Sequence, residues 1–534
     1  MPLTAMRVIS LVGLMGSGKT EVGRVLARRL GWEFIDTDAE IEAREGRSVA
    51  AIFQDAGEGY FRLAERDVVR RATRGRRRVI ATGGGAVLSP RSRRALTQAG
   101  PVFYLRAPVE VLLQRVGNDP TRPLLGDDPR ASLERLLRER EALYLQTGMP
   151  VDAARPADAV ADDILAQLAA SRRRVRVDLG SRSYDVLIGI GTQALVGYDL
   201  GQMGAGGQVA VVTHRSLLRR FGASVVAALE GCGFMVRTIA VPAGERAKTL
   251  RQASRILDAL GAAGLTRSDT LVALGGGVIG DLAGFAAGIY MRGIRFVQLP
   301  TTLLAQLDSS IGGKTAVNHP RAKNLVGVYH QPALVVADIE VLRHLPLRER
   351  RAGLAEAVKY GVVLDRELFE WLARDPQRLV GQDAWHDLEE VVFRCASLKA
   401  RVVAQDEFEQ GPREVLNYGH TVGHAIEAAM PGVLVHGEAV AVGMRVEARV
   451  AVRLSLMADG DADRQDTLLR RLGLPVTVPE GPVGPLLDAM RLDKKRRDGR
   501  IRCTLPEGIG RARLGVDVPE SLMEEVLRLC QESW

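Results

Sequence analysis

The motif with the clearest chemistry lies near the start of the chain. Residues 13–20 read GLMGSGKT, and they stand between an apolar run that predicts a strand and a stretch that predicts a helix. In this setting the loop amides are expected to bind phosphates, Lys19 to neutralise the outer ones, and Thr20 to bind Mg²⁺. The pattern predicts a nucleoside triphosphate site and leaves the phosphoryl acceptor open.

Two carboxylates follow at the end of the next predicted strand. Asp36 and Asp38 are separated by one residue, so one carboxylate could hold a water molecule of a metal ion and the other could bind an acceptor hydroxyl. Each could equally cap a helix that is expected from Ala39. The sequence alone leaves both interpretations open.

A second glycine cluster lies at residues 275–281, GGGVIGD, between a predicted strand (270–274) and a helix expected at 281–289. Glycines let the backbone approach a ligand and a helix N-terminus attracts anions, which favours a phosphate or dinucleotide site. A tight strand-to-helix turn is equally compatible. No acidic residue ends a second strand about 20 residues later, as it would in an ordinary Rossmann unit. A dinucleotide would therefore bind here in a variant way.

Three histidines form a candidate metal site. His420 and His424 are four residues apart and His436 follows closely. The spacing of four places His420 and His424 on one helix face, which suits a pair of metal ligands. Glu356 is a polar position in an otherwise apolar predicted helix, and it is a candidate third ligand.

Lysine is scarce, since only eight of the 73 basic side chains are lysines. A chain that uses arginine for most of its surface charge is expected to keep lysine mainly where a compact, mobile ammonium is needed. Lys19 fits this, because it lies in the phosphate loop. The other seven are site candidates: Lys248, Lys314, Lys323, Lys359, Lys399, Lys494 and Lys495.

Length and composition indicate an ordinary globular protein of about three domains. The 534 residues are 46% apolar and 26% charged, and they contain no apolar run long enough to span a membrane. The start does not resemble a signal peptide and the four cysteines are widely spaced, so we expect reduced thiols and a cytoplasmic protein. The net charge of +9 comes without a recognisable nucleic-acid module. We therefore expect small-molecule substrates, with neither nucleic acid nor membrane as partner.

The predicted fold class is α/β. A P-loop kinase-type domain with a parallel sheet is expected at 1–171. A Rossmann-like α/β domain is expected at 172–345, where strands at 209–213, 234–240 and 270–274 alternate with helices at 216–229 and 250–261. A mainly α-helical domain is expected at 346–534, with the residues of the second glycine cluster at the seam.

Residues 1 to about 170 resemble shikimate kinase. The resemblance rests on the phosphate loop, the Asp-x-Asp pair, residues 59–62 (GYFR), 83–85 (GGG), 121–125 (TRPLL) and 140–144 (REALY). It implies Mg²⁺ at Thr20 and Asp36, and catalytic roles for Asp38, Lys19 and Arg122. ATP would be bound by Gly13, Gly16, Ser17, Gly18, Lys19, Thr20, Arg115 and Arg122, and shikimate by Asp38, Arg62, Gly83, Gly84, Gly85 and Arg140.

From about Arg173 to the end, the chain resembles 3-dehydroquinate synthase. The motifs are residues 275–281, 290–293 (YMRG), 308–314, 323–324, 356–359, Lys399 and 413–424. The resemblance implies zinc or cobalt on Glu356, His420 and His436, which differs from the helix-face pair, and a homodimer formed through this part. NAD would be bound by Glu245, Lys248, Gly276, Gly277, Asp281, Thr301, Thr302, Lys314 and Lys323.

The same resemblance implies a heptulosonate phosphate substrate and its catalytic residues. Catalysis would use Lys314, Lys359, Lys399, Arg413, Asn417 and His424. The substrate would be bound by Arg292, Asp308, Lys314, Asn324, Lys399, Arg413, Asn417, His424, Lys494 and Lys495.

The sequence therefore predicts a bifunctional enzyme of chorismate and aromatic amino acid biosynthesis. The kinase would phosphorylate shikimate, and the synthase would convert 3-deoxy-D-arabino-heptulosonate 7-phosphate to 3-dehydroquinate and phosphate. Three alternatives stay open: a metal-dependent polyol dehydrogenase or another sugar-phosphate cyclase in the C-terminal part, and a nucleotide-sensing module in the N-terminal part.

Overall fold

The structure is a computed structural model that describes residues 6–116, 128–320, 322–381, 384–492 and 501–531. Its backbone contacts divide the chain into two compact units. Unit 1 comprises residues 1–172, 189–209 and 218–237, and unit 2 comprises residues 173–188, 210–217 and 238–534. The expected domain boundaries at 172 and 345 stay predictions.

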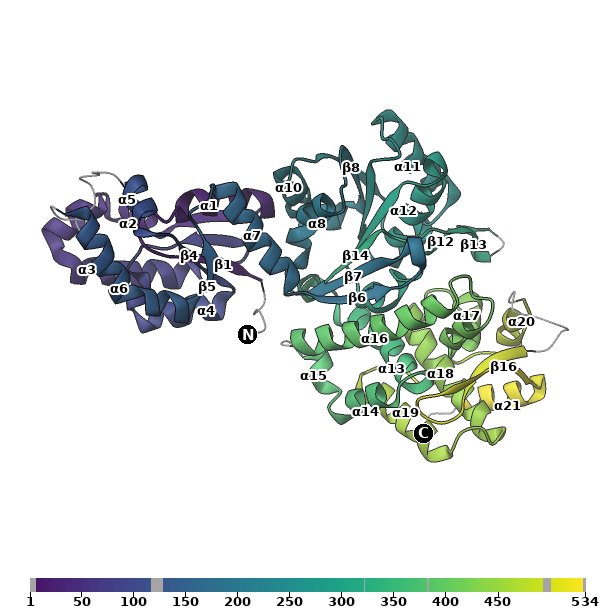
Figure 1. Cartoon of the computed structure of the whole chain (residues 1–534). Coiled ribbons are helices and arrows are strands. Elements are labelled where there is room, and N and C mark those ends of the chain that lie inside the picture. The colour runs from purple at the N-terminus through teal and green to yellow at the C-terminus, as the bar shows by residue number, and fades with distance from the viewer. Residues whose placement is uncertain (1–5, 117–127, 321, 382–383, 493–500, 532–534) are drawn as a thin grey trace. The chain divides into compact units, whose positions relative to one another are not determined.

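Unit 1 contains a five-stranded sheet in the order β2-β3-β1-β4-β5, whose neighbours all pair in parallel. The central strand β1 (Val8–Val12) is buried along its whole length, as expected when helices cover both faces. Figure 1 shows α1 and α7 over one face and α4 and α6 over the other. The remaining elements are β2 (Glu33–Asp36), β3 (Arg78–Ala81), β4 (Val102–Arg106), β5 (Met149–Asp152), α1 (Lys19–Leu30), α2 (Thr37–Glu45), α3 (Val49–Ala72), α4 (Pro90–Ala99), α5 (Val109–Val116), α6 (Pro129–Thr147) and α7 (Ala157–Ala170).

The loop between β1 and α1 turns through left-handed backbone conformations. Gly16 has φ 78° and Gly18 has φ 84°, and α1 begins directly afterwards at Lys19. Glycine adopts this region without steric cost, so the glycines place the first turn of α1 over the loop. The next helix begins at Thr37, two residues earlier than the sequence pattern suggested, because the Asp36 side chain caps it.

The second sheet has seven strands in the order β6-β7-β14-β11-β10-β8-β9. β6 and β7 pair antiparallel, whereas β10, β11 and β14 pair in parallel. The strands are β6 (Arg173–Val177), β7 (Tyr184–Gly189), β8 (Gln208–His214), β9 (Met235–Val241), β10 (Thr270–Gly275), β11 (Arg295–Pro300) and β14 (Leu334–Asp338), with β12 (Lys314–His319) and β13 (Ala322–Tyr329) as a separate antiparallel pair.

Two helix predictions in this region were inexact. The expected single helix at 216–229 is divided into α9 (Arg215–Leu217), a π-helical turn and α10 (Ala223–Gly231). The helix expected from Asp281 is α12 (Gly277–Ile289), which begins inside the glycine cluster. Apolar periodicity is insensitive to a local change of helix pitch and to glycines at a helix start, so neither feature was visible in the pattern.

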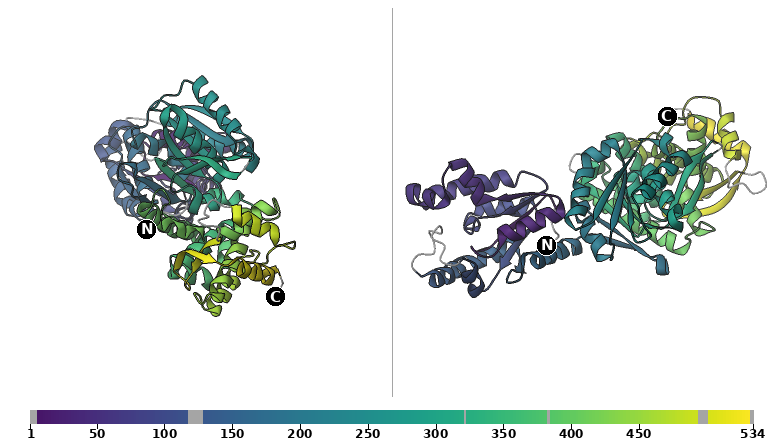
Figure 2. Two further views of the ribbon diagram at one scale, coloured as in Figure 1. Left: turned by 90° about the vertical axis from the view of Figure 1, so that its right-hand side faces the viewer. Right: turned by 90° about the horizontal axis from the view of Figure 1, so that it is seen from above.

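The part of unit 2 after β14 is mainly helical, as predicted. Figure 2 shows this green-to-yellow layer beside the teal α/β layer. The elements of this layer are α13 (Leu347–Val363), α14 (Arg366–Arg374), α15 (Gln377–Val380), α16 (Trp385–Gln405), α17 (His420–Ala429), α18 (His436–Arg453), α19 (Asp459–Arg471), α20 (Gly484–Leu492), the hairpin of β15 (Ile501–Pro506) and β16 (Ala512–Val518), and α21 (Glu520–Gln531). Two further helices, α8 (Val196–Gln202) and α11 (Leu250–Ala262), precede β14 in the chain.

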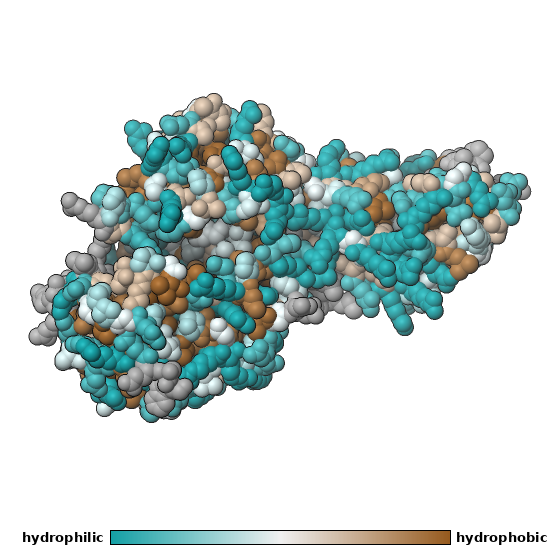
Figure 3. Space-filling model, turned by 180° about the vertical axis from the view of Figure 1, so that it is seen from behind, coloured by the Kyte–Doolittle hydropathy of each residue, from teal (hydrophilic) through white to brown (hydrophobic). Residues whose placement is uncertain are grey.

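The hydropathy of the surface and of the helices bears on whether the chain can span a membrane. Hydrophilic side chains cover much of the face in Figure 3, with apolar residues between them. Among the described helices, none combines the length and the hydropathy that crossing a bilayer requires.

Helices α17 and α18 approach each other closely because glycine lines their contact. A Cβ atom added at Gly443 would overlap the carbonyl oxygen of Gly419, and one at Gly423 would lie 3.1 Å from the carbonyl oxygen of Ala439. The buried carboxylate of Glu447 on α18 accepts hydrogen bonds from the amides of Gly419 (2.6 Å) and Val422 (3.3 Å). These contacts fix the start of α17 against α18.

We predict that Gly443→Ala loosens this helix pair, because the added methyl group has no space. Overpacking of this kind costs about 1–3 kcal/mol, so the amides of α17 and α18 should exchange hydrogen faster by about 5- to 150-fold. Gly460→Ala in α19 is the control, since nothing lies within 4 Å of its Cβ position. Equal exchange in both variants would contradict the proposed role of the glycine contact.

Candidate functional site

The phosphate loop of unit 1 lies against the carboxylate of Asp36. The Thr20 hydroxyl donates to Oδ2 of Asp36 at 2.7 Å, and Lys19 Nζ donates to the carbonyls of Gly13 (2.9 Å) and Leu14 (2.8 Å). Oδ1 of Asp36 caps α2 at the same time. The helix cap predicted as one interpretation is therefore present at Asp36, and the predicted role of Asp36 at Mg²⁺ stays a prediction.

Asp38 lies beside a second carboxylate that the sequence analysis missed. Glu65 on α3 is 2% exposed and pairs with Arg62 at 2.8 Å. A Cβ atom at Gly83 would lie 2.5 Å from both Asp38 Oδ1 and Glu65 Oε1, and one at Gly85 would overlap the Arg62 guanidinium. A side chain at either position would displace the carboxylates or the guanidinium. The structure thus brings together five of the predicted acceptor-site residues, together with Arg140, which donates to the Gly84 carbonyl at 3.3 Å.

The acidity of Asp38 is strongly perturbed. Burial raises its pKa, and the neighbouring carboxylates of Glu65 and Asp36 raise it further, while Lys19 and Arg62 lower it by less. The resulting pKa is about 7. A carboxylate with this pKa is matched to proton transfer near neutral pH.

Two arginines were predicted to contact ATP. Arg115 donates to the Ala153 carbonyl at 2.8 Å, and its Nη1 would lie 3.6 Å from a Cβ atom at Gly18, so the guanidinium lies beside the phosphate loop. Arg122 falls outside the described residues, as do Lys494 and Lys495 of the second site.

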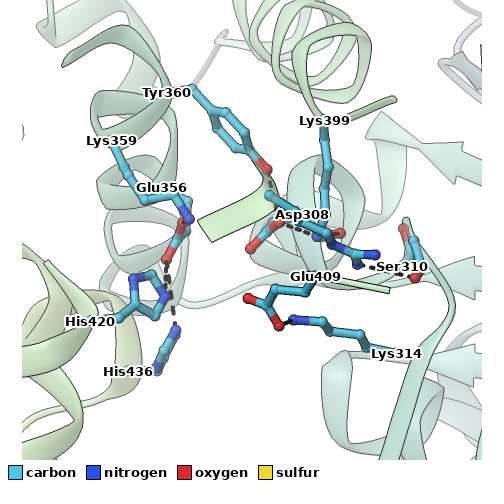
Figure 4. A network of polar contacts seen from close by, with 12 residues as sticks. Asp308, Ser310, Lys314, Glu356, Lys359, Tyr360, Lys399, Glu409, His420 and His436 are labelled. Atoms are coloured by element: carbon cyan, nitrogen blue, oxygen red, sulfur yellow. Dashed lines mark hydrogen bonds and ion pairs between the residues drawn. The ribbon is translucent and has the colours of Figure 1, made fainter. Parts of the chain in front are cut away.

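In unit 2, one carboxylate and two histidines converge from three helices. Glu356 of α13, His420 of α17 and His436 of α18 offer ligand atoms that all lie within 4.8 Å of one another. His420 Nε2 lies 3.5 Å and His436 Nε2 lies 3.7 Å from Glu356 Oε1. Figure 4 shows both rings directed at this carboxylate. This is the set that the resemblance implied.

The other ring nitrogens of these histidines have partners of their own. His420 Nδ1 lies 3.1 Å from the Tyr418 carbonyl, and His436 Nδ1 lies 3.1 Å from Glu427 Oε2. Such partners orient a histidine whose free nitrogen faces a metal. Glu427 was not singled out by the sequence analysis.

His424 belongs to a different group. It shares a face of α17 with His420, and their ring centroids are 5.2 Å apart. Yet its ligand atom groups with Glu427 and His436 rather than with Glu356 and His420. Helix periodicity placed His420 and His424 correctly on one face, but it could not show which of them faces α13.

Glu356 is a fully buried charge surrounded by cations. Burial alone would raise its pKa, but the Lys359 ammonium, with which it forms an ion pair, and His420 outweigh this and hold the pKa at about 2. Burial and Lys359 together lower the pKa of His420 well below its ordinary value. Burial would also lower the pKa of His436, but its bonds to Glu356 and Glu427 raise it to about 10.

A second polar cluster lies next to this one (Figure 4). The Tyr360 hydroxyl donates to Asp308 Oδ1 at 2.8 Å, and Lys399 Nζ donates to the Asp308 carbonyl at 2.8 Å and pairs with its carboxylate. Burial lowers the pKa of Lys399 to about 8, although Asp308 opposes this. Burial would raise the pKa of Asp308, but Lys399 and Lys359 hold it well below its ordinary value.

Glu409 is another residue that the sequence analysis missed. Its carboxylate pairs with Lys314 and accepts from Asn417 Nδ2 at 3.2 Å, and its own backbone has φ 56°. Arg413 donates to the Gly312 carbonyl at 3.1 Å. The structure therefore brings two of the predicted substrate residues, Lys314 and Asn417, to this carboxylate of the chain itself.

Several of the predicted dinucleotide residues lie around the start of α12, whereas Lys314 and Lys323 pair with Glu409 and Glu427. Lys248 pairs with Asp281 and also donates to Asn324, and the Thr301 amide donates to the Gly275 carbonyl at 3.0 Å. Cβ atoms would press on Thr302 at Gly276 (2.9 Å) and on Ser309 at Gly277 (3.1 Å). Glu245 accepts from Asn318 on β12, and Lys323 on β13 pairs with Glu427. For Arg292, the structure gives a left-handed φ of 67° after α12.

Comparison with known proteins identifies both parts. The shikimate kinase family model matches residues 15–169, and the N- and C-terminal models of 3-dehydroquinate synthase match residues 238–352 and 353–496. The 3-dehydroquinate synthase of Pelobacter propionicus is 50% identical over 335 residues, covering 62% of this chain and 93% of that protein. The chain belongs to the 3-dehydroquinate synthase family. A shikimate kinase domain precedes the synthase in the same chain.

Further relatives agree with the synthase assignment. The 3-dehydroquinate synthase of Desulforamulus reducens is 45% identical, covering 66% of this chain and 99% of that protein. A solved 2-deoxy-scyllo-inosose synthase has a TM-score of 0.62 and 29% identity, covering 67% of this chain and all (100%) of its own. The 2-epi-5-epi-valiolone synthase of Streptomyces hygroscopicus has a TM-score of 0.61 and 30% identity, covering 66% and 98%.

We predict that the pH dependence of the kinase reports the carboxyl of Asp38. The kcat/KM should fall as the pH decreases through about 7, because only the ionised carboxylate accepts a proton. Glu65→Gln removes a like charge and should move the inflection to lower pH. Glu40→Gln, on the exposed surface of α2, should leave it in place; an inflection near the ordinary carboxyl pKa in the parent enzyme would exclude the assignment.

Proposed function

We propose that the kinase domain transfers the terminal phosphoryl group of ATP to a hydroxyl of shikimate. The observation that supports this most is the clustering of Asp38, Arg62 and Arg140 around the glycines at 83–85, across from the phosphate loop. Arginine binds the carboxylate of a small acid in two-pronged fashion. Mg²⁺ would be held at Thr20 and Asp36, whose side chains already meet, and when bound it would neutralise phosphate charge.

In this proposal the side chains of the protein hold ATP and shikimate in place, and the chemical step takes place between the two substrates. Lys19 binds the phosphates at the loop, Arg62 and Arg140 orient the acceptor acid, and Asp38 takes the proton of the attacking hydroxyl. Phosphoryl transfer depends mainly on positioning and on charge neutralisation, and these residues supply both.

For the synthase, we propose conversion of 3-deoxy-D-arabino-heptulosonate 7-phosphate to 3-dehydroquinate and phosphate, with NAD⁺ and zinc or cobalt. The cluster of Glu356, His420 and His436 carries the proposal. It fits a divalent metal, because both rings direct Nε2 at the same oxygen of a buried carboxylate, and nitrogen and carboxylate ligands suit such an ion. The two solved relatives support it, since they contain NAD⁺ with Zn²⁺ or Co²⁺.

The glycines at the start of α12 fit a dinucleotide, because side chains at Gly276 and Gly277 would fill the space next to Thr302 and Ser309. When bound, NAD⁺ would take up and return a hydride, and the metal would lower the pKa of a substrate hydroxyl. The overall reaction is then redox-neutral.

The chain's own residues would bind the anionic substrate. Lys314 and Asn417 both contact Glu409, and Arg413 contacts the carbonyl of Gly312 two residues before Lys314. These cationic and amide groups would bind the substrate's phosphate and carboxylate, which would replace the carboxylate of Glu409. Lys399, with its pKa near 8, can hold or release a proton at neutral pH. His424 lies beside the metal group, where it can contact the phosphate side of the substrate.

The main alternative is a sugar-phosphate cyclase that forms another ring. The two solved relatives are such enzymes, but their identities of 30% and 29% are far below the 50% found with a 3-dehydroquinate synthase. A polyol dehydrogenase, in contrast, would consume NAD⁺ in proportion to substrate.

The deciding measurement is phosphate release from the heptulosonate phosphate by the full-length protein with a trace of NAD⁺. We expect release that exceeds the amount of NAD⁺, stops on addition of a chelator, and leaves no NADH. Accumulation of NADH in step with substrate loss would indicate a dehydrogenase. Product analysis by mass spectrometry separates 3-dehydroquinate from other rings.

Metal analysis of single variants tests the ligand set. His436→Ala and His420→Ala should lose bound metal, because each removes a nitrogen that faces Glu356. His424→Ala is the matched variant on the same helix face as His420, and it should keep the metal while turnover falls. Metal loss in His424→Ala with retention in His420→Ala would reverse the assignment.

A further inference from the structure

A carboxylate next to the metal group connects one of its histidines to another layer of unit 2. Glu427 lies one helical turn after His424 on α17, and its side chain is 16% exposed. Oε2 lies 3.1 Å from His436 Nδ1, and Oε1 lies 3.3 Å from Lys323 Nζ on β13. Its two oxygens thus contact a helix of the helical layer and a strand of the β12–β13 pair.

The contact with His436 decides which nitrogen of that ring is available. The Glu427 carboxylate can only accept a hydrogen bond at this contact, so it stabilises the form of His436 that carries a proton on Nδ1. In that form Nε2 is the nitrogen that can bind a metal, and Nε2 is the atom that faces Glu356, at 3.7 Å. The carboxylate also restrains the rotation of the ring.

We propose that Glu427 is a positioning residue for the metal site of the synthase. It holds His436 with Nε2 toward Glu356 and His420, and Lys323 holds Glu427 in turn. The proposal rests on the proposed function, because it concerns the same metal. It also gives Lys323, predicted to contact the dinucleotide, a link to the metal ligand through a single side chain.

An alternative use of Glu427 is as a ligand. With His424 and His436 it forms a second group whose ligand atoms lie within 4.8 Å of one another. Burial favours the positioning role. His424 is exposed, whereas Glu356 is fully buried and His420 is half-buried.

The test uses full-length protein and compares Glu427→Ala with Glu427→Gln. Loss of an outer partner of a metal-bound histidine typically weakens metal binding by about 10- to 100-fold. We expect a loss of this size for Glu427→Ala in competition with a zinc chelator. Glu427→Gln should recover part of the affinity, because the amide oxygen can still accept a hydrogen bond from Nδ1. Glu525→Gln, a surface carboxylate paired with Arg453 on α18, should bind zinc like the parent.

Two further readouts separate positioning from folding and from direct ligation. The visible spectrum of the cobalt-loaded protein should shift in Glu427→Ala, since the orientation of a ligand changes, while the hydrogen exchange of metal-free α17 and α18 should not. An unchanged zinc affinity and cobalt spectrum would overturn the proposal. A parent stoichiometry of two metals that falls to one in Glu427→Ala would also overturn it, in favour of a second site. If the parent bound no metal, the proposed function itself would fail.

Discussion

The synthase site depends on the burial of one negative charge. Glu356 is inaccessible to solvent, and a carboxylate in such a position is tolerated only when cations surround it. Lys359 comes from the next turn of the same helix, and the two histidines come from the first positions of α17 and α18. The glycine contact between α17 and α18 and the capping carboxylate of Glu447 bring those two positions side by side. The helical layer therefore places one ammonium and two imidazole rings around a single buried carboxylate.

The kinase site has a buried carboxylate in the opposite situation. Burial raises the pKa of Asp38 and the neighbouring carboxylates of Glu65 and Asp36 raise it further, to about 7, whereas the pKa of Glu356 is held at about 2 by Lys359 in spite of burial. The same side-chain chemistry thus gives a group suited to accept a proton in one domain and a permanent anion in the other. The difference arises from the neighbouring charges and not from the degree of burial, which is high for both.

The sequence predicted much of this arrangement, and the reasons for its failures are physical. The phosphate loop and the α/β order followed from glycine spacing and apolar periodicity, and the scarcity of lysine pointed to Lys248, Lys314, Lys359 and Lys399 before their contacts were known. Glu65, Glu409 and Glu427 were missed because acidic residues are common and only tertiary contacts distinguish these three. Tertiary contacts also decide between His424 and His436 as the partner of His420. Apolar periodicity describes a single helix, whereas the candidate metal group is assembled from three helices. The residue assignments in both sites stay predictions until variants are measured.

A metal held by residues of three different helices would have a thermodynamic consequence. A ligand that binds only the folded arrangement stabilises it by an amount that grows with the logarithm of its concentration over its dissociation constant. A cation bridging α13, α17 and α18 would link α13, which ends at Val363, to two helices that begin at His420 and His436. The concentration of available metal would then affect the free energy of local unfolding of the helical layer. The activity of the synthase and its resistance to local unfolding would rise and fall together in the cell.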